Sequence, residues 1–163
     1  MKLALVLACV AACTRPQHPI VAGDLVGRSA PPFALPIVGR DGSVALAKLA
    51  GHVIVVDFWA SWCTPCEAAL PHLDDWQRRF ATRGLTVVGI SGDDVADIAK
   101  FAATRDIAFP LVRDDGDEVA SSYRIGALPT MVVIDKSGVV RYIDVGGRNF
   151  GAIETILVQL LAS

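Results

Sequence analysis

The stretch HVIVVDFWASWCTPCE, residues 52–67, decides the fold. Residues 53–56 are a β-branched run without polar alternation, which indicates a strand buried on both faces. Residues 67–70, directly after the second cysteine, favour a helix. We therefore expect Cys63 and Cys66 to lie where a buried strand passes into a helix.

This position favours thiol chemistry at the cysteine pair. The start of a helix offers backbone N–H groups without partners and the positive end of the helix dipole, and both favour a thiolate at Cys63. The spacing of the motif places the two sulfurs on one side of the first turn, close enough to bridge. We predict a dithiol that opens and closes, with Cys63 as the nucleophile and Cys66 as the resolving thiol.

Three other interpretations of the pair are weaker. A permanent disulfide staple over so short a loop would constrain little unfolded-state entropy. A zinc site needs four ligands, and no second cysteine pair follows in the chain. A c-type haem needs a histidine directly after the second cysteine, where this chain has Glu67. We therefore expect neither a metal nor a cofactor.

The composition is that of one ordinary globular domain. The chain has 163 residues, of which 53% are hydrophobic and 20% charged, and its net charge is −2. Lysine and arginine are scattered, so nucleic acid is not an expected partner, and we expect a monomer. The acidic run at residues 114–118 lacks the ligand spacing of a calcium loop and is interpreted as a helix cap with a solvated face.

Asp57 ends the apolar strand and is the one charged residue in it. A lone carboxylate in a strand buried on both faces is costly, so its pKa is expected to be raised. Hydrogen bonding for structure alone is the alternative interpretation of this side chain.

Hydrophobic periodicity predicts the remaining elements. An Asp-Gly turn indicates a hairpin within residues 29–51. A long helix is expected over 64–82 with a kink at Pro71, and a second over 93–103 with Val95, Ile98 and Phe101 directed inward. Further strands are expected at 85–91, 107–112, 131–135 and 139–145, and a final helix at 150–161.

The segment VDFWASWCTPC, residues 56–66, resembles the active-site segment of thioredoxins. Over residues 27–162 the chain resembles the TlpA/ResA-type thioredoxin-like thiol-disulfide oxidoreductases, which are related to the AhpC/TSA redoxins. The resemblance implies an α/β thioredoxin-like fold, in which helices flank a central mixed sheet. It also implies an N-terminal β-hairpin and a central helix-strand insertion at 93–124.

The resemblance also implies roles for residues outside the cysteine pair. Asp57 would exchange a proton with Cys66, and Pro129 would be the cis-proline that faces the cysteines. Leu128 would offer backbone groups to an extended segment of a disulfide-containing client protein, and Trp62 would form an apolar rim beside it. Glu67 departs from the basic residue frequent in the family, and its negative charge disfavours a thiolate at Cys63. A membrane dithiol carrier would supply the electrons.

Residues 1–13, MKLALVLACVAAC, resemble a bacterial lipoprotein signal with residues 10–13 as the lipobox. Cleavage would remove residues 1–12 and leave Cys13 acylated, with residues 13–28 as lipidated cysteine and tether and 29–163 as the thioredoxin-like domain. More than one acyl chain gives stable attachment to a membrane. We therefore expect a lipid-anchored protein of the cell envelope that faces the periplasm. An ordinary export signal is the alternative.

Two other functions fit the same fold. Thiol peroxidases of the peroxiredoxin type place threonine three residues before the reactive cysteine and proline four residues earlier, where this chain has Ala60 and Val56. Copper carriers use a wider cysteine spacing and a downstream histidine, and His72 is the one histidine after Cys66. Thr64 and Pro65 lack the histidine found between the cysteines of strong oxidants, so we favour a reductase, such as one acting in cytochrome c maturation.

Overall fold

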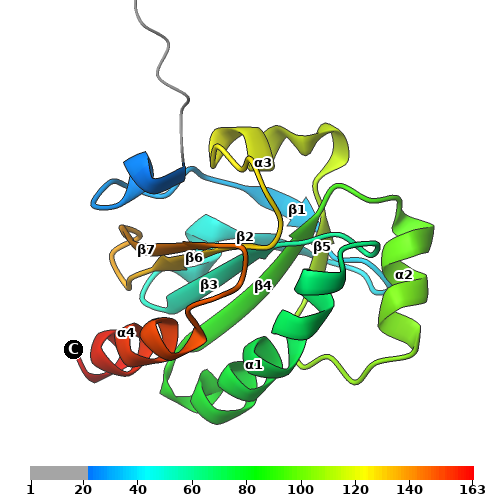
Figure 1. Cartoon of the computed structure of the whole chain (residues 1–163). Helices are drawn as coiled ribbons and strands as arrows, with labels where there is room; N and C mark the ends of the chain where they lie inside the picture. The colour runs from blue at the N-terminus through cyan, green and yellow to red at the C-terminus, as the bar shows by residue number, and fades with distance from the viewer. Residues whose placement is uncertain (1–21) are drawn as a thin grey trace, which may run out of the picture.

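The computed structural model describes residues 22–163, which form a central mixed sheet with helices on both faces (Figure 1). The sheet has five strands in the order β5-β4-β3-β6-β7, and a separate hairpin is formed by β1 and β2. The strands are β1 Ala34–Pro36, β2 Ser43–Ala45, β3 Val53–Phe58, β4 Leu85–Ser91, β5 Leu111–Arg113, β6 Thr130–Ile134 and β7 Val140–Val145. The α-helices are α1 Thr64–Phe80, α2 Val95–Ala103, α3 Glu118–Ser122 and α4 Phe150–Ala162.

The topology confirms the predicted thioredoxin-like arrangement. Strands β3, β4 and β5 run parallel, whereas β6 is antiparallel to both β3 and β7. A parallel pair needs a crossover, which α1 supplies between β3 and β4. Every residue of β3 is buried, as the continuous apolar run predicts for a central strand. The N-terminal hairpin is present, and α2, β5 and α3 lie between β4 and β6 in the chain.

Alternation along β3 divides the core into two layers. Val53 and Val55 belong to an apolar cluster with residues of α1, α2 and α4. Ile54, Val56 and Phe58 belong to a second cluster, which includes Tyr123 at the end of α3 and residues of the hairpin. Figure 1 shows α1 and α4 below the sheet and α3 above it.

Helix α1 begins directly after Cys63 and carries Pro65 in its first turn, where no backbone N–H is needed. Its buried residues are Cys66, Ala69, Leu73, Trp76 and Phe80. These positions recur every three or four residues and form one buried face of the helix. The helix ends two residues earlier than expected and continues as a 3-10 turn, Ala81–Arg83, that Gly84 closes at a φ of 93°.

Two sequence expectations were wrong in detail. Val95 is 50% exposed instead of directed inward, whereas Ile98 and Phe101 are buried and Ala102 packs against the same core. The strand expected over 107–112 begins only at Leu111, after Pro110. Proline has no N–H to donate to a ladder, although the Pro110 carbonyl still accepts from Gly89 N at 3.0 Å.

N-terminal segments pair with part of each edge strand of the sheet. At β7, Gly27 N donates to Val140 O at 2.8 Å and Val140 N donates to Arg28 O at 2.9 Å. At β5, Val38 N donates to Leu111 O at 2.9 Å. Residues 22–28, which the sequence assigns to the tether, thus contact the domain. None of the helices within 22–163 has the length and apolar content to cross a membrane.

Candidate active site

Cys63 and Cys66 are joined by a disulfide at the start of α1. The S–S distance is 1.99 Å and the two Cα atoms are 5.2 Å apart. Cys63 is the N-cap residue of the helix, and its Sγ accepts a hydrogen bond from Cys66 N at 3.2 Å. A backbone N–H directed at this sulfur, together with the helix dipole, favours a thiolate when the pair is reduced.

The two sulfurs differ in access. Cys63 lines a groove of about 660 Å³, whereas Cys66 does not and is 2% exposed. Cys63 is itself only 6% exposed, so its place on the groove, and not its exposed fraction, distinguishes the two cysteines. The groove is walled by the active-site turn, by the start of α3 and by the segment before β6 (Trp62, Cys63, Thr64, Pro65, Asp117, Ala120, Ser121, Ile125, Gly126, Ala127 and Leu128).

Trp62 and Leu128 give this groove its apolar character. Trp62 is 74% exposed, the largest exposed fraction among the large hydrophobic side chains that the structure describes. Leu128 precedes Pro129 through a cis peptide bond. The structure therefore places Trp62 and Leu128 on the same groove as Cys63. Within residues 22–163 no backbone group of Leu128 forms a hydrogen bond to another backbone group.

The segment around Pro129 is held from two sides. Gly146 N donates to Pro129 O at 2.7 Å, and Thr130 Oγ1 donates to Ala127 O at 2.8 Å. A Cβ at Gly147, whose φ is 61°, would lie 3.0 Å from Pro129 Cγ. Glycine at 147 therefore permits this close approach and the positive φ together.

Asp57 is a buried carboxylate on the α1 face of the sheet. It lies two residues after Val55 in β3 and therefore on the same face of the strand, so its side chain projects into the layer that contains Cys66. It is 1% exposed, and its Oδ1 has no hydrogen-bond partner within the described residues. Burial raises the pKa of Asp57 to about 7, which confirms the predicted direction. A carboxyl group with this pKa can hold or release a proton near neutral pH.

Asp114 positions the α3 wall of the groove. The side chain is 1% exposed, and its two oxygens accept hydrogen bonds from Val119 N at 3.1 Å and Ala120 N at 2.8 Å. Asp114 thus supplies acceptors to the first turn of α3, whereas the N-cap residue, Asp117, forms no side-chain cap hydrogen bond. The neighbouring Asp115, by contrast, forms a surface ion pair with Arg113 at 3.0 Å.

We predict that Asp114→Ala lowers the free energy of unfolding by about 1–3 kcal/mol, because two buried N–H groups lose their acceptor. Urea unfolding measures this difference. Asp115→Ala is the matched control, and it should change stability by less than about 0.5 kcal/mol because it removes an exposed pair. Equal effects of the two substitutions would contradict the capping role.

Arg105 is a site neighbour that sequence reasoning missed. Its guanidinium forms an ion pair with Glu67, which directly follows Cys66. The two residues are 38 positions apart, and no local pattern links them. The expectation for Glu67 did not include this cation, which faces the Glu67 charge.

The fold and the Cys63–Cys66 disulfide at the start of α1, with Cys63 on the groove, define a thiol-disulfide oxidoreductase of the thioredoxin type. Residues 26–143 match the AhpC/TSA family. The chain is 33% identical over 123 residues to the thiol-disulfide oxidoreductase ResA of Geobacillus thermodenitrificans, covering 74% of this chain and 70% of ResA. The chain belongs to the AhpC/TSA family and is a TlpA/ResA-like, thioredoxin-family protein.

Two further similarities agree with this placement. The chain is 33% identical over 124 residues to protein DipZ of Mycobacterium tuberculosis, covering 72% of this chain but only 18% of DipZ. A solved structure of a candidate thiol:disulfide interchange protein DsbE from Chlorobium tepidum superposes with a TM-score of 0.79 at 33% identity. That match covers 83% of this chain and 97% of the other.

Proposed function

We propose that the protein reduces disulfide bonds of exported proteins by dithiol–disulfide exchange at Cys63 and Cys66. The observation that carries the proposal is the asymmetry of the pair. One sulfur lines an open groove at a helix start and the other is buried behind it. This geometry suits an attacking thiol and a resolving thiol.

The exchange balances without a cofactor. The Cys63 thiolate attacks one sulfur of the client disulfide, so that a mixed disulfide forms and one client thiolate leaves. Cys66 loses its proton and attacks the Cys63 sulfur, which closes the Cys63–Cys66 bond and releases the second client thiolate. Two electrons pass from the enzyme dithiol to the client, and solvent protons convert the client thiolates to thiols.

Asp57 is proposed as the group that accepts the Cys66 proton. Its position on the α1 face and its pKa of about 7 support this role. An ionised carboxylate at pH 7 takes a proton from a thiol that apolar burial would otherwise keep protonated.

Client binding is proposed at the groove. An extended client segment would pair with the backbone of Leu128 beside Pro129 and pack against Trp62. Two observations support this site. Trp62 is exposed, and the backbone of Leu128 forms no hydrogen bond to another backbone group within residues 22–163. Apocytochrome c cysteines are one client class that fits this reading.

Localisation and electron supply complete the proposal. A lipoprotein signal at residues 1–12 and an acylated Cys13 would hold the domain at the cell envelope, facing the periplasm. Both lie outside the described residues. A membrane dithiol carrier would reduce the Cys63–Cys66 bond between turnovers, and the domain would act as a monomer.

Reduction of insulin by the purified protein with dithiothreitol tests the function. We expect catalysed turnover and, in graded glutathione buffers, a single two-electron transition of Cys63 and Cys66. Hydrogen peroxide is the competing substrate. Faster turnover on peroxide than on protein disulfides would favour a thiol peroxidase instead, and retention of Cu(I) against a chelator would favour a copper carrier.

A further inference from the structure

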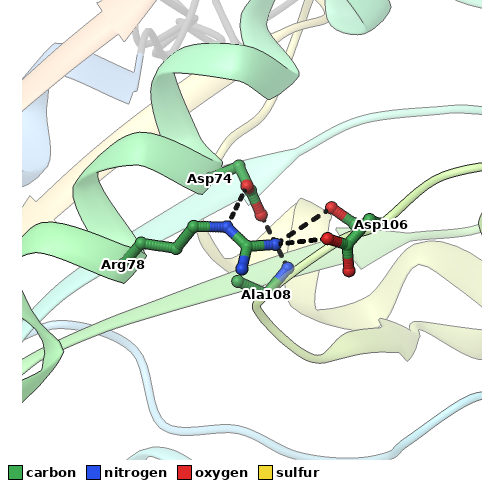
Figure 2. Close-up of polar contacts among 4 residues, drawn as sticks. All are labelled: Asp74, Arg78, Asp106 and Ala108. Carbon is green, nitrogen blue, oxygen red and sulfur yellow. Dashed lines mark hydrogen bonds and ion pairs between the residues drawn. The ribbon is translucent and has the colours of Figure 1, made fainter.

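The segment that joins α2 to β5 is fastened to the active-site helix at two places. Near the start of α1, Arg105 forms an ion pair with Glu67. Two turns further along, Arg78 binds Asp74 at 2.6 Å and Asp106 at 3.1 Å, and Asp74 also accepts from Ala108 N at 2.6 Å (Figure 2). We call these the proximal clamp and the distal clamp.

The Arg105 guanidinium is held in place independently of Glu67. Its Cζ atom lies 3.9 Å from the centre of the Phe101 ring, a distance suited to a cation–π contact. Its Nη1 donates to Phe101 O and to Thr104 Oγ1, each at 3.0 Å. The side chain is 30% exposed. A cation with this many local contacts stays beside the first turn of α1 when Glu67 loses its charge.

Glu67 lies in the same first turn of α1 as the cysteine pair. It follows Cys66 directly, and its backbone N–H donates to Cys63 O at 3.2 Å. A negative charge in the first turn opposes a thiolate at Cys63, whereas a fixed positive charge favours it. The charges of Arg105 and Glu67 therefore act on the ionisation of the Cys63 thiol, as the helix start does.

We propose that Arg105 sets the redox poise of the Cys63–Cys66 pair by neutralising the charge of Glu67. The inference rests on the proposed function and adds to it a tuning group from the central insertion. Arg105 acts through Glu67 and is not placed in contact with the reacting sulfurs. Three other carboxylates lie around the active-site turn: Asp57 is buried in β3, Asp117 lines the groove, and Asp93 accepts a hydrogen bond from Ser61 N at 2.6 Å. All three stay unchanged in every variant below.

The test compares Cys63 thiolate formation and the glutathione equilibrium in single and double variants at low salt. Arg105→Gln should raise the Cys63 titration midpoint by about half a pH unit and make the protein about threefold more reducing. Glu67→Gln should shift both quantities the opposite way. The double variant should return close to the parent, and Arg105→Lys should keep the parent values. In about 1 M salt the differences should shrink.

The distal clamp supplies the matched control. Seven residues separate Glu67 from Asp74, which is about 10 Å along a helix and close to one Debye length at 0.1 M salt. Arg78→Gln removes an arginine from a similar ion pair on the same helix. It should lower the midpoint of thermal unfolding as Arg105→Gln does, but leave the pH midpoint of the Cys63 titration unchanged.

Three results would overturn the inference. The first is an unchanged glutathione equilibrium in both Arg105→Gln and Glu67→Gln. The second is an equal shift in Arg78→Gln. The third is a double variant whose shift equals the larger single shift. Failure of the proposed function would give a different result, because the parent protein itself would then show no reversible two-electron transition.

Discussion

Cys63→Ser is expected to reduce insulin turnover to the rate of dithiothreitol alone, a loss of about 100-fold or more. The reason lies in the geometry of the groove. Cys63 is the cysteine sulfur that lines it, and Cys66 is 2% exposed behind it. A serine hydroxyl at position 63 cannot form the mixed disulfide, and Cys66 cannot reach a folded client in its place.

Cys66→Ser is the control that separates loss of the nucleophile from loss of the fold. It leaves Cys63 on the groove and removes only the second step, so stable mixed disulfides with clients should accumulate. Non-reducing electrophoresis followed by mass spectrometry detects them. Trapping by Cys63→Ser instead of Cys66→Ser would show that the roles of the two cysteines are reversed. Full activity of Cys63→Ser would show that Cys63 is not the nucleophile.

Asp57→Asn is expected to stabilise the oxidised protein at alkaline pH, by an amount on the order of 2–4 kcal/mol. Burial raises the pKa of Asp57 from 3.8 to about 7 in the folded protein. Between these values the folded protein binds more protons than the unfolded chain, so its stability falls as the pH rises. The contribution of the protonated carboxyl is complete below about pH 4 and is lost as the pH passes through 7.

Chemical unfolding of the oxidised form at pH 4 and at pH 8 measures this effect. The parent should lose stability relative to Asp57→Asn between the two values, and Asp97→Asn, an exposed change on α2, should follow the parent. Parallel pH profiles of parent and Asp57→Asn would show that the carboxyl titrates normally.

The same substitution should slow resolution of the mixed disulfide, because the buried proton acceptor is lost. Stopped-flow measurements at pH 7 with a peptide disulfide separate this step from the initial attack by Cys63. Slowing of the first step alone would argue against proton exchange with Cys66.

Local patterns predicted much of the fold. The apolar run of β3, the cysteine turn and the helix after it depend on neighbours in sequence, so periodicity and helix-start chemistry suffice. Asp57 stood out because a charge in a fully apolar strand conflicts with its surroundings. Its direction toward the α1 layer then follows from strict alternation.

The predictions that were wrong or missing depend on contacts between residues that are distant in the sequence. Periodicity predicted the inward face of α2. It could not show that the first turn of this helix extends beyond the core it packs on, so Val95 was wrongly predicted to be buried. The apolar composition of residues 107–112 suggested a strand that begins earlier, but β5 begins only after Pro110. The pairing of Arg105 with Glu67 depends on how the α2–β5 connection packs against α1. That is a tertiary contact which no window of sequence contains.

The pairing of the two edge strands with N-terminal residues affects where an unfolded client chain can add to the sheet. The outer hydrogen bonds of Val140 at one end of the sheet and of Leu111 at the other are taken up by the chain's own N-terminal residues. Open strand edges invite extended chains to add on and aggregate. With those two positions paired, they offer no free backbone groups to another extended chain, and the proposed pairing of a client segment at Leu128 would meet less competition there.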